Sequence, residues 1–347
     1  MSVTKENHTE PLANGEVKTL QDIAELCGVS ASTVSRVLNN EPNISRETTR
    51  RVMEVVAEYG FTPTRRKRSL TRSQARLLLV VPDSTDTADN PFFDMGELLQ
   101  AIGGAFGRDR KSIETVSFSE LGAGDSPDGA AADGVIFAFG HPDETAKRHL
   151  NERQIPYIFL NRILDDENYV SCNHFKGALR LRKHLADVGC RRVGYLGCTS
   201  IPVNSDRRRG YETGTREAGM GIEDEVIHEV SDIGDVGMDA VDYFLDRGCD
   251  GVMCFNDNFA IRFITSLSDA GVSVPGDMAV TGFDDSPLRR VFTPIITTIS
   301  LSTFEMGFFA ARWLRDNIQH RESRTLRLEV EGILITGETT MRGDRHE

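Results

Sequence analysis

Hydrophobic and polar positions near the start of the chain follow the period of two short helices. The first covers residues 19–27, where Thr19 is a suitable N-cap and Asp22 stands in the capping-box position. Gly-Val-Ser at residues 28–30 predicts a turn before a second helix over residues 31–39. The apolar faces of the two helices consist of Ile23, Ala24 and Cys27 and of Val34, Val37 and Leu38. Such a pair is typical of the unit that lays one helix in a DNA major groove.

The outer face of the second helix is suited to close approach by another molecule. Its residues are small or polar, namely Ala31, Ser32, Ser35 and Arg36. Ser30 is a suitable N-cap for the same helix. Such a face can approach base edges and phosphates, although a plain amphipathic helical hairpin is the alternative for these two helices alone.

A third helix and a basic segment follow. The helix is expected to begin at Ser45 and to end at Gly60. After Pro63, residues 64–72 contain five Lys or Arg residues, no acidic residue and one large apolar residue, Leu70. The cations can neutralise phosphates, and Leu70 can wedge between base steps from the minor groove. A solvated basic linker is the alternative for this segment taken alone.

From residue 76 onward, short apolar runs alternate with amphipathic helical stretches. The predicted strands are Leu77–Val81, Gly134–Phe139, Tyr157–Leu160, Arg192–Leu196, Gly251–Phe255 and Met278–Phe283. Helices are predicted near residues 95–107, 174–188, 207–218, 236–247, 258–270 and 303–317. This alternation indicates parallel sheets with helical crossovers, whose ligands bind beyond the carboxyl ends of the strands.

The loops after these strands combine aromatic rings with side chains that form paired hydrogen bonds. The candidate residues are Asp83, Phe92, Phe93, Asn161, Arg162, Asp206, Arg207, Asn256, Asp257, Asp284 and Asp285. Aromatic faces pack on sugar rings while Arg, Asn and Asp bind hydroxyls, so the set predicts a sugar site. Two alternatives stay open: Phe92 and Phe93 can be core residues, and Asp257 can cap the following helix rather than contact a ligand.

Composition favours a soluble, cytoplasmic protein. The chain of 347 residues has no apolar run long enough to span a membrane, and its polar N-terminus lacks the apolar core of a signal peptide. Its six cysteines show no Cys-x-x-Cys spacing, and its eight histidines show no metal spacing. No metal or cofactor is therefore expected, and His174 and His184 are interpreted as surface or helix-cap residues.

The net charge of −13 is divided unevenly along the chain. Residues 1–75 hold eleven Lys or Arg against nine Asp or Glu, which leaves +2 there and −15 on the remainder. The segment 64–72 is the one concentrated cationic zone, and phosphate should repel the acidic remainder. This division favours DNA binding through one end of the chain.

Residues 19–72 resemble the headpiece and hinge of the lactose-repressor/galactose-repressor (LacI/GalR) family of bacterial transcription factors. The matching residues are Gly28-Val29-Ser30, Thr33-Val34-Ser35-Arg36-Val37, Asn39, Tyr59-Gly60-Phe61, Pro63 and Arg68-Ser69-Leu70. The resemblance implies that Ala31, Ser32 and Arg36 read bases and that Leu70 is the minor-groove wedge. It implies phosphate or other DNA contacts from Thr19, Ser30, Thr33, Ser35, Asn39 and Arg68. Because many members have longer residues at positions 31 and 32, much of the base readout rests on Arg36.

The resemblance continues to about residue 342 and implies a body similar to a periplasmic sugar-binding protein. Such a body has two α/β subdomains joined by three crossings, with an effector in the cleft. The motifs that match are Asn90-Pro91-Phe92-Phe93, Arg207 before Gly210-Tyr211, Asn256-Asp257 and Gly282-Phe283-Asp284-Asp285. By position, the implied effector contacts are Phe93, Arg207, Asn256 and Asp284, with Phe92 and Arg162 behind them. One departure is Asn173-His174, which stands near the place where members usually show Asp-Asn.

The predicted fold is an all-α helix-turn-helix headpiece with a hinge helix, followed by an α/β periplasmic-binding-protein-like body of two parallel-sheet subdomains. The expected parts are a tail at 1–17, the headpiece at 18–63, the hinge at 64–75, the body at 76–342 and a tail at 343–347. In the body, subdomain 1 is expected at about 76–165 and 299–329, and subdomain 2 at about 166–298 and 330–342.

An enzyme is the main alternative from another class, and the motifs argue against it. Gly122-x-Gly124 has Pro127 in place of the third glycine of a dinucleotide loop. The sequence contains no Gly-x-Ser-x-Gly elbow, Walker loop or His-Glu-x-x-His motif. A regulator controlled by a protein partner or by a non-sugar metabolite is the nearer alternative.

The expected function is therefore repression of carbohydrate uptake or catabolism genes at the bacterial nucleoid. A homodimer would place two recognition helices on a near-palindromic operator in double-stranded DNA, and paired hinges would drive Leu70 into the central step. A sugar-like effector would move the hinges and change operator affinity.

Overall fold

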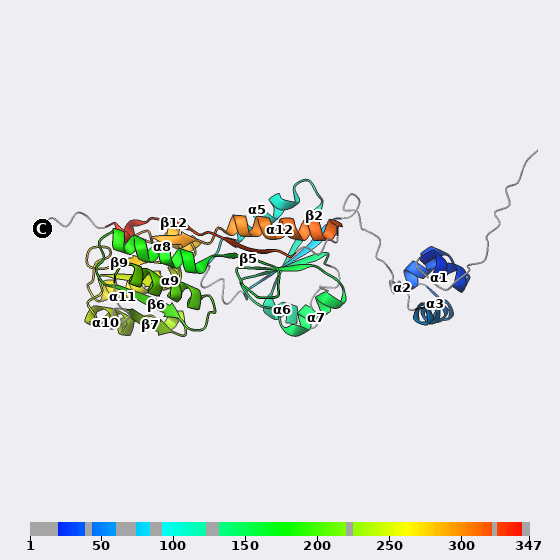
Figure 1. Cartoon of the computed structure of the whole chain (residues 1–347), viewed down its shortest axis with the longest axis horizontal. Helices are drawn as coiled ribbons and strands as arrows, with labels where there is room; N and C mark the ends of the chain where they lie inside the picture. The colour runs from blue at the N-terminus through cyan, green and yellow to red at the C-terminus, as the bar shows by residue number, and fades with distance from the viewer. Residues whose placement is uncertain are drawn as a thin grey trace, which may run out of the picture. The chain divides into compact units, whose positions relative to one another are not determined.

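The structure is a computed structural model that describes residues 20–38, 44–59, 74–83, 92–122, 132–219, 225–320 and 325–341. Contacts divide the chain into two compact units, Met1–Arg68 and Ser69–Glu347, both drawn in Figure 1. Within the described residues, none of the helices is both long enough and apolar enough to cross a membrane.

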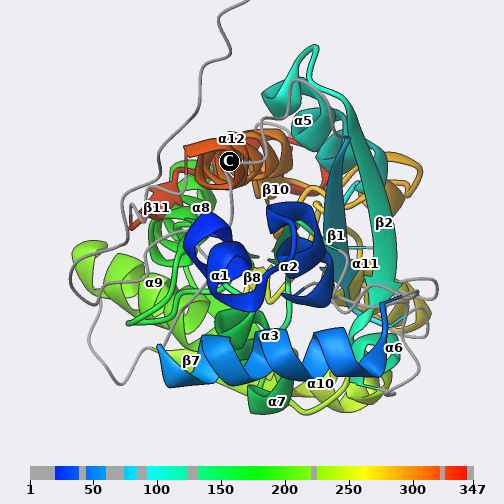
Figure 2. The ribbon, with the colours of Figure 1, turned by 90° about the vertical axis from the view of Figure 1, so that its right-hand side faces the viewer.

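The first unit, the headpiece, contains three helices that pack on one another (Figure 2). They are α1 (Leu20–Cys27), α2 (Ala31–Leu38) and α3 (Arg46–Glu58). The turn between α1 and α2 uses Gly28 at a φ of 61°, a conformation that glycine adopts without strain. Ser30 and Ser45 accept hydrogen bonds from the backbone N–H groups of Thr33 and Thr48, so the two predicted caps are confirmed. The core consists of Ile23, Ala24, Cys27, Val34, Val37 and Val52.

The second unit begins with a lobe built on a parallel six-stranded sheet in the order β11-β5-β4-β3-β1-β2. Its strands are β1 (Ala75–Val81), β2 (Lys111–Ser117), β3 (Gly134–Ala138), β4 (Tyr157–Leu160), β5 (Tyr169–Cys172) and β11 (Arg327–Val330). Its helices are α5 (Met95–Phe106), α6 (Phe118–Gly122), α7 (Glu144–Glu152) and α12 (Thr303–His320). Leu77 and Leu79 face α5 and α12 while Leu78 and Val80 face the α6 and α7 side, so each face of the sheet buries alternate residues (Figure 1).

The second lobe is built on a parallel four-stranded sheet in the order β7-β6-β8-β9. Its strands are β6 (Val193–Cys198), β7 (Val226–Val230), β8 (Gly251–Cys254) and β9 (Ala279–Thr281). Its helices are α8 (His174–Asp187), α9 (Asn204–Glu217), α10 (Met238–Asp246) and α11 (Asp257–Asp269), with 3-10 turns at Ile233–Asp235, Pro287–Arg290 and Glu338–Thr340. Tyr195 and Met253 face α8 and α9, whereas Leu196 and Cys254 face α10 and α11.

The chain passes between the two lobes three times, after β5, after β10 (Thr298–Ser300) and before β12 (Ile333–Ile335). β10 and β12 pair antiparallel in a small sheet of their own. The first crossing lies after Cys172 and not near residue 165 as expected, because Tyr169–Cys172 pairs with β4 and β11 in the first sheet.

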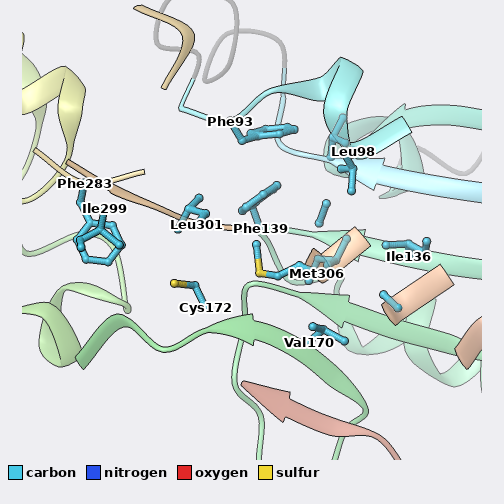
Figure 3. Close-up of a cluster of buried hydrophobic side chains, with 14 of the residues drawn as sticks. Phe93, Leu98, Ile136, Phe139, Val170, Cys172, Phe283, Ile299, Leu301 and Met306 are labelled. Carbon is cyan, nitrogen blue, oxygen red and sulfur yellow. The ribbon is translucent and has the colours of Figure 1, made fainter. Parts of the chain in front are cut away.

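Apolar residues at these crossings join the cores of the two lobes (Figure 3). Cys172, Ile299 and Leu301 belong to one buried cluster with Phe139 of the first lobe and Phe283 of the second. The polar side chains described next therefore lie beside a continuous apolar junction, which shields them from water.

Candidate functional site

The predicted DNA-reading face of α2 is on the surface of the headpiece. Ser32 and Arg36 are exposed and stand one helical turn apart, while Ala31, Thr33 and Ser35 are partly exposed. The hydroxyl of Ser30 lies 2.8 Å from the hydroxyls of both Ser32 and Thr33. These hydroxyl groups gather at the N-terminus of α2, where backbone N–H groups favour phosphate. Thr19, Asn39, Arg68 and Leu70 lie outside the described residues.

A buried ion pair lies near the crossings in the second unit. Arg207 in α9 and Asp284 after β9 have side chains that are 3% and 4% exposed, and Nη2 of the arginine donates to Oδ1 of the carboxylate at 2.6 Å. Nη1 of Arg207 donates to the carbonyl oxygen of Phe255 at 2.6 Å. The guanidinium also lies over the rings of Phe283 and Phe255, at 3.9 and 4.7 Å from their centroids.

His174 connects this ion pair to the first lobe. Nε of Arg207 donates to Nδ1 of His174 at 3.3 Å, and Nε2 of His174 lies 2.9 Å from Oδ1 of Asn161. The same oxygen accepts the backbone N–H of Cys172, so Nε2 of the histidine carries the proton and Nδ1 is the acceptor. Burial and the positive charge of Arg207 lower the pKa of His174 well below its ordinary value, which keeps the ring neutral. We name Asn161, His174, Arg207 and Asp284 the interlobe network.

The interpretation of His174 as a surface or helix-cap residue is wrong. His174 is 2% exposed rather than on the surface, and Asn173 is the residue whose side chain caps α8, through the N–H of Lys176. His184, also interpreted as a surface or cap residue, is half-buried and contacts the hydroxyl of Thr340. A lone histidine at the start of an amphipathic helix gives no sign of burial, because its partners come from distant parts of the chain.

Asp284 and Asp285 form a strained turn that aims Asp284 at Arg207. Both residues have positive φ, 103° and 55°, a region that L residues other than glycine seldom adopt. Oδ2 of Asp257 accepts the N–H of Ser286 at 2.6 Å, and the N–H of Asp257 donates to the carbonyl oxygen of Phe283 at 2.9 Å. These two hydrogen bonds hold both ends of the turn.

The interpretation of Asp257 as a helix cap is wrong. Asn256 is the N-cap of α11, since its Oδ1 accepts the N–H of Phe259, and Asp257 is the first helical residue. Burial raises the pKa of Asp257 to about 8. Burial raises the pKa of the Asp284 carboxyl, while the charge of Arg207 and hydrogen bonds from Arg207 and Asn256 partly oppose that rise.

The candidate residues of the first lobe lie in two places. Phe92 and Phe93 form an aromatic cluster with Phe139, with ring centroids 5.1 and 4.3 Å from the centroid of Phe139 (Figure 3 shows Phe93 and Phe139). Phe93 is buried in the junction core and Phe92 is partly buried, so the core interpretation describes their packing. Arg162 follows Asn161 and donates from Nη1 to the carbonyl oxygen of that residue at 2.8 Å.

We expect the Asp284→Asn substitution to lower the free energy of unfolding of the second unit by about 3–5 kcal/mol, because it leaves a buried guanidinium without its counter-charge. Adding Arg207→Gln should restore part of that loss. Urea denaturation of the single and double variants measures the coupling, and strictly additive effects would contradict a direct pair.

The neutral state of His174 makes the second unit sensitive to acid. Its folded pKa is lowered, so the unfolded chain takes up a proton below about pH 6.5 that the folded chain does not, and stability falls as pH falls. The contribution of this residue is up to about 1.4 kcal/mol per pH unit. Urea denaturation at pH 7.5 and 5.5 should show a smaller pH dependence in His174→Gln than in the unsubstituted protein, and an equal dependence would contradict the assignment.

Two models of known protein families match parts of this chain. The model "Bacterial regulatory proteins, lacI family" matches residues 19–64, and the model "Periplasmic binding protein-like domain" matches residues 182–340. The transcriptional regulator CelR of Thermobifida fusca is 29% identical over 92% of this chain and 98% of its own length. The regulator GalR of Escherichia coli is 28% identical over 84% of this chain and 87% of its own length.

Solved structures agree with the sequence comparison. A complex of the transcriptional regulator CelR with cellobiose has a TM-score of 0.65 at 26% identity and covers 93% of this chain and 100% of that chain. A LacI-family regulator from Enterococcus faecium with bound ribose shares the fold of the body, with a TM-score of 0.63 at 21% identity, over 76% of this chain and 98% of that chain. The chain thus combines a lacI-family DNA-binding domain at residues 19–64 with a periplasmic-binding-protein-like domain at residues 182–340, and over most of its length it is similar to bacterial transcriptional regulators.

Proposed function

We propose that this chain is a repressor of carbohydrate uptake or catabolism genes whose affinity for its operator is changed by a small sugar-like effector at the lobe junction. The observation that carries the proposal is the buried ion pair of Arg207 and Asp284, connected through His174 to the first lobe. Hydroxyl groups of a sugar can exchange paired hydrogen bonds with such a pair. The relatives that are similar to this chain include a regulator bound to cellobiose and a ribose operon repressor.

The effector contacts that we propose are Phe92, Phe93, Arg162, Arg207, Asn256 and Asp284. Phe92, Phe93 and Arg162 belong to the first lobe, and Arg207, Asn256 and Asp284 belong to the second. A ligand held by both lobes changes their relative position, and the crossings carry that change to the hinge at residues 64–75. Coupling of this kind is typically about 1–3 kcal/mol.

DNA recognition is assigned to a homodimer of the headpiece at residues 18–63, acting at the bacterial nucleoid. Two copies of α2 would enter successive major grooves of a near-palindromic operator. The contacts that we propose are Thr19, Ser30, Ala31, Ser32, Thr33, Ser35, Arg36, Asn39, Arg68 and Leu70.

The deciding experiment selects genomic DNA fragments with the purified full-length protein at moderate salt, without and with a pooled sugar extract. A short near-palindrome whose enrichment changes with the extract supports the proposed switch. Enrichment that the extract leaves unchanged would favour a protein partner or a non-sugar metabolite as the controlling signal.

Arg36→Ala should weaken operator binding by about 1–3 kcal/mol, because it removes the long side chain of α2 that can bond a base edge. Binding to unrelated DNA should change little. Arg50→Ala is the matched control, since Arg50 is an exposed arginine of α3. Fluorescence anisotropy with operator and scrambled duplexes separates the two effects, and equal losses on both duplexes would remove Arg36 from base readout.

At a temperature at which circular dichroism shows the variant folded, Asp284→Asn should bind operator DNA normally but lose its response to the sugar extract, because the substitution changes the body and not the headpiece. Asp206→Asn is the matched control: Asp206 lies beside Arg207 in sequence and pairs with the exposed Arg209. Operator titrations with and without extract test this. A response that survives in Asp284→Asn would exclude this carboxylate from the switch.

A further inference from the structure

The side chains of Arg162, Arg207 and Asp284, which we name the interlobe site, hold more positive than negative charge. Arg207 is paired with Asp284. Arg162 is a second guanidinium, and its pKa is lowered by the charge of Arg207 and raised by that of Asp284. Guanidinium groups stay protonated in proteins, so the three side chains together carry a net charge of +1.

Arg162 is partly buried and has few hydrogen-bond partners among the described residues. Nη1 donates to the carbonyl oxygen of Asn161, and Nε is buried with no hydrogen-bond partner among the described residues. Burial and the charge of Arg207 lower the pKa of Arg162 to about 10, and Asp284 opposes that shift only in part. Its positive charge is thus retained at neutral pH, and no carboxylate of the described residues forms an ion pair with it.

Within the described part of the chain, the neighbouring titratable groups do not supply a negative charge for Arg162. His174 is neutral, and the pKa of His141 is lowered by burial and by Arg162 itself. Asp285 is bonded to Arg289, at 2.6 Å, and to Arg290, at 3.1 Å. A charge that is partly removed from water and lacks a counter-ion is unfavourable, and an arginine fork binds carboxylate or phosphate through paired hydrogen bonds.

We propose that the effector carries an anionic group, a carboxylate or a phosphate, and that Arg162 binds this group. The inference rests on the proposed function, because it assigns the ligand of the same site. Arg207 and Asp284 are already neutralised by each other and suit the hydroxyl groups of the ligand. The class of effector is then a sugar acid or a sugar phosphate rather than a neutral sugar.

The first test uses anions that do not depend on the identity of the sugar. Inorganic phosphate and gluconate, at constant ionic strength, should raise the thermal unfolding midpoint of the second-unit transition of the full-length protein, and neutral glucose should not. Arg162→Gln should abolish the anion-dependent increase, and Arg162→Lys should retain part of it, since the positive charge remains. Arg153→Gln is the matched control because Arg153 is exposed at the end of α7. An equal increase in Arg162→Gln, or no increase in the unsubstituted protein, would overturn the inference.

A second test distinguishes a carboxylate from a phosphate as the anionic group. The operator titrations that follow distinguish failure of this inference from failure of the proposed function. Calorimetric titrations with glucose, gluconate, glucuronate and glucose 6-phosphate compare neutral, carboxylate and phosphate ligands. We expect an anionic ligand to bind at least tenfold more tightly than glucose, and Arg162→Gln to remove that preference. Equal or tighter binding of glucose would contradict the inference.

The affinity for operator DNA is then measured with each of the same ligands. Release or tightening by an anionic sugar, lost in Arg162→Gln, supports both proposals. A change caused by glucose alone overturns the anionic ligand and leaves the sugar-responsive switch standing. Anion binding at Arg162 that leaves operator affinity unchanged supports the anion site and contradicts the switch.

Discussion

The buried contact between Arg207 and Asp284 constrains the rest of the body. Removing two charges from water is costly, and the mutual attraction compensates only when every remaining donor and acceptor is satisfied. Phe255 and His174 accept two further hydrogen bonds from Arg207, and its guanidinium lies over two aromatic rings. The need to complete this set of partners explains why a neutral histidine is buried at the start of α8.

The same constraint explains the backbone strain at the lobe junction. Among the described residues, five of the six non-glycine residues with positive φ are Phe139, Asn161, Asp284, Asp285 and Ser302, and each follows a strand or stands at a crossing. Such conformations cost about 1–3 kcal/mol each and persist where the surroundings fix them. Here they direct Asn161 and Asp284 toward partners from other elements, so the strain maintains the geometry of the network.

The sequence predicts much of this fold, since six apolar runs correspond to strands of the two sheets. It misses β5, a strand of four residues inside the first sheet, and β10 and β12 of the small sheet. It also misses β2 and β11, which are edge strands with partly exposed residues and no continuous apolar run, and β7 at the edge of the second sheet. Arg207 and Asp284 are recognisable from their motifs, whereas Asn161 and His174 become a pair only when the first crossing places them together. Local patterns carry no information on such long-range polar contacts.

The charge of the junction differs from that of the chain around it. The chain beyond residue 75 carries −15, yet the interlobe site carries +1 through Arg162. Exposed charges are screened over about 8–10 Å in physiological salt, whereas buried charges interact more strongly across a medium of low polarity. An excess of acidic residues in the body therefore disfavours contact with DNA phosphates but does not prevent a small anion from binding at Arg162. Under the two proposals, positive charge is used twice, in the basic segment at residues 64–72 for DNA and at Arg162 for the effector, without competition between the two ligands.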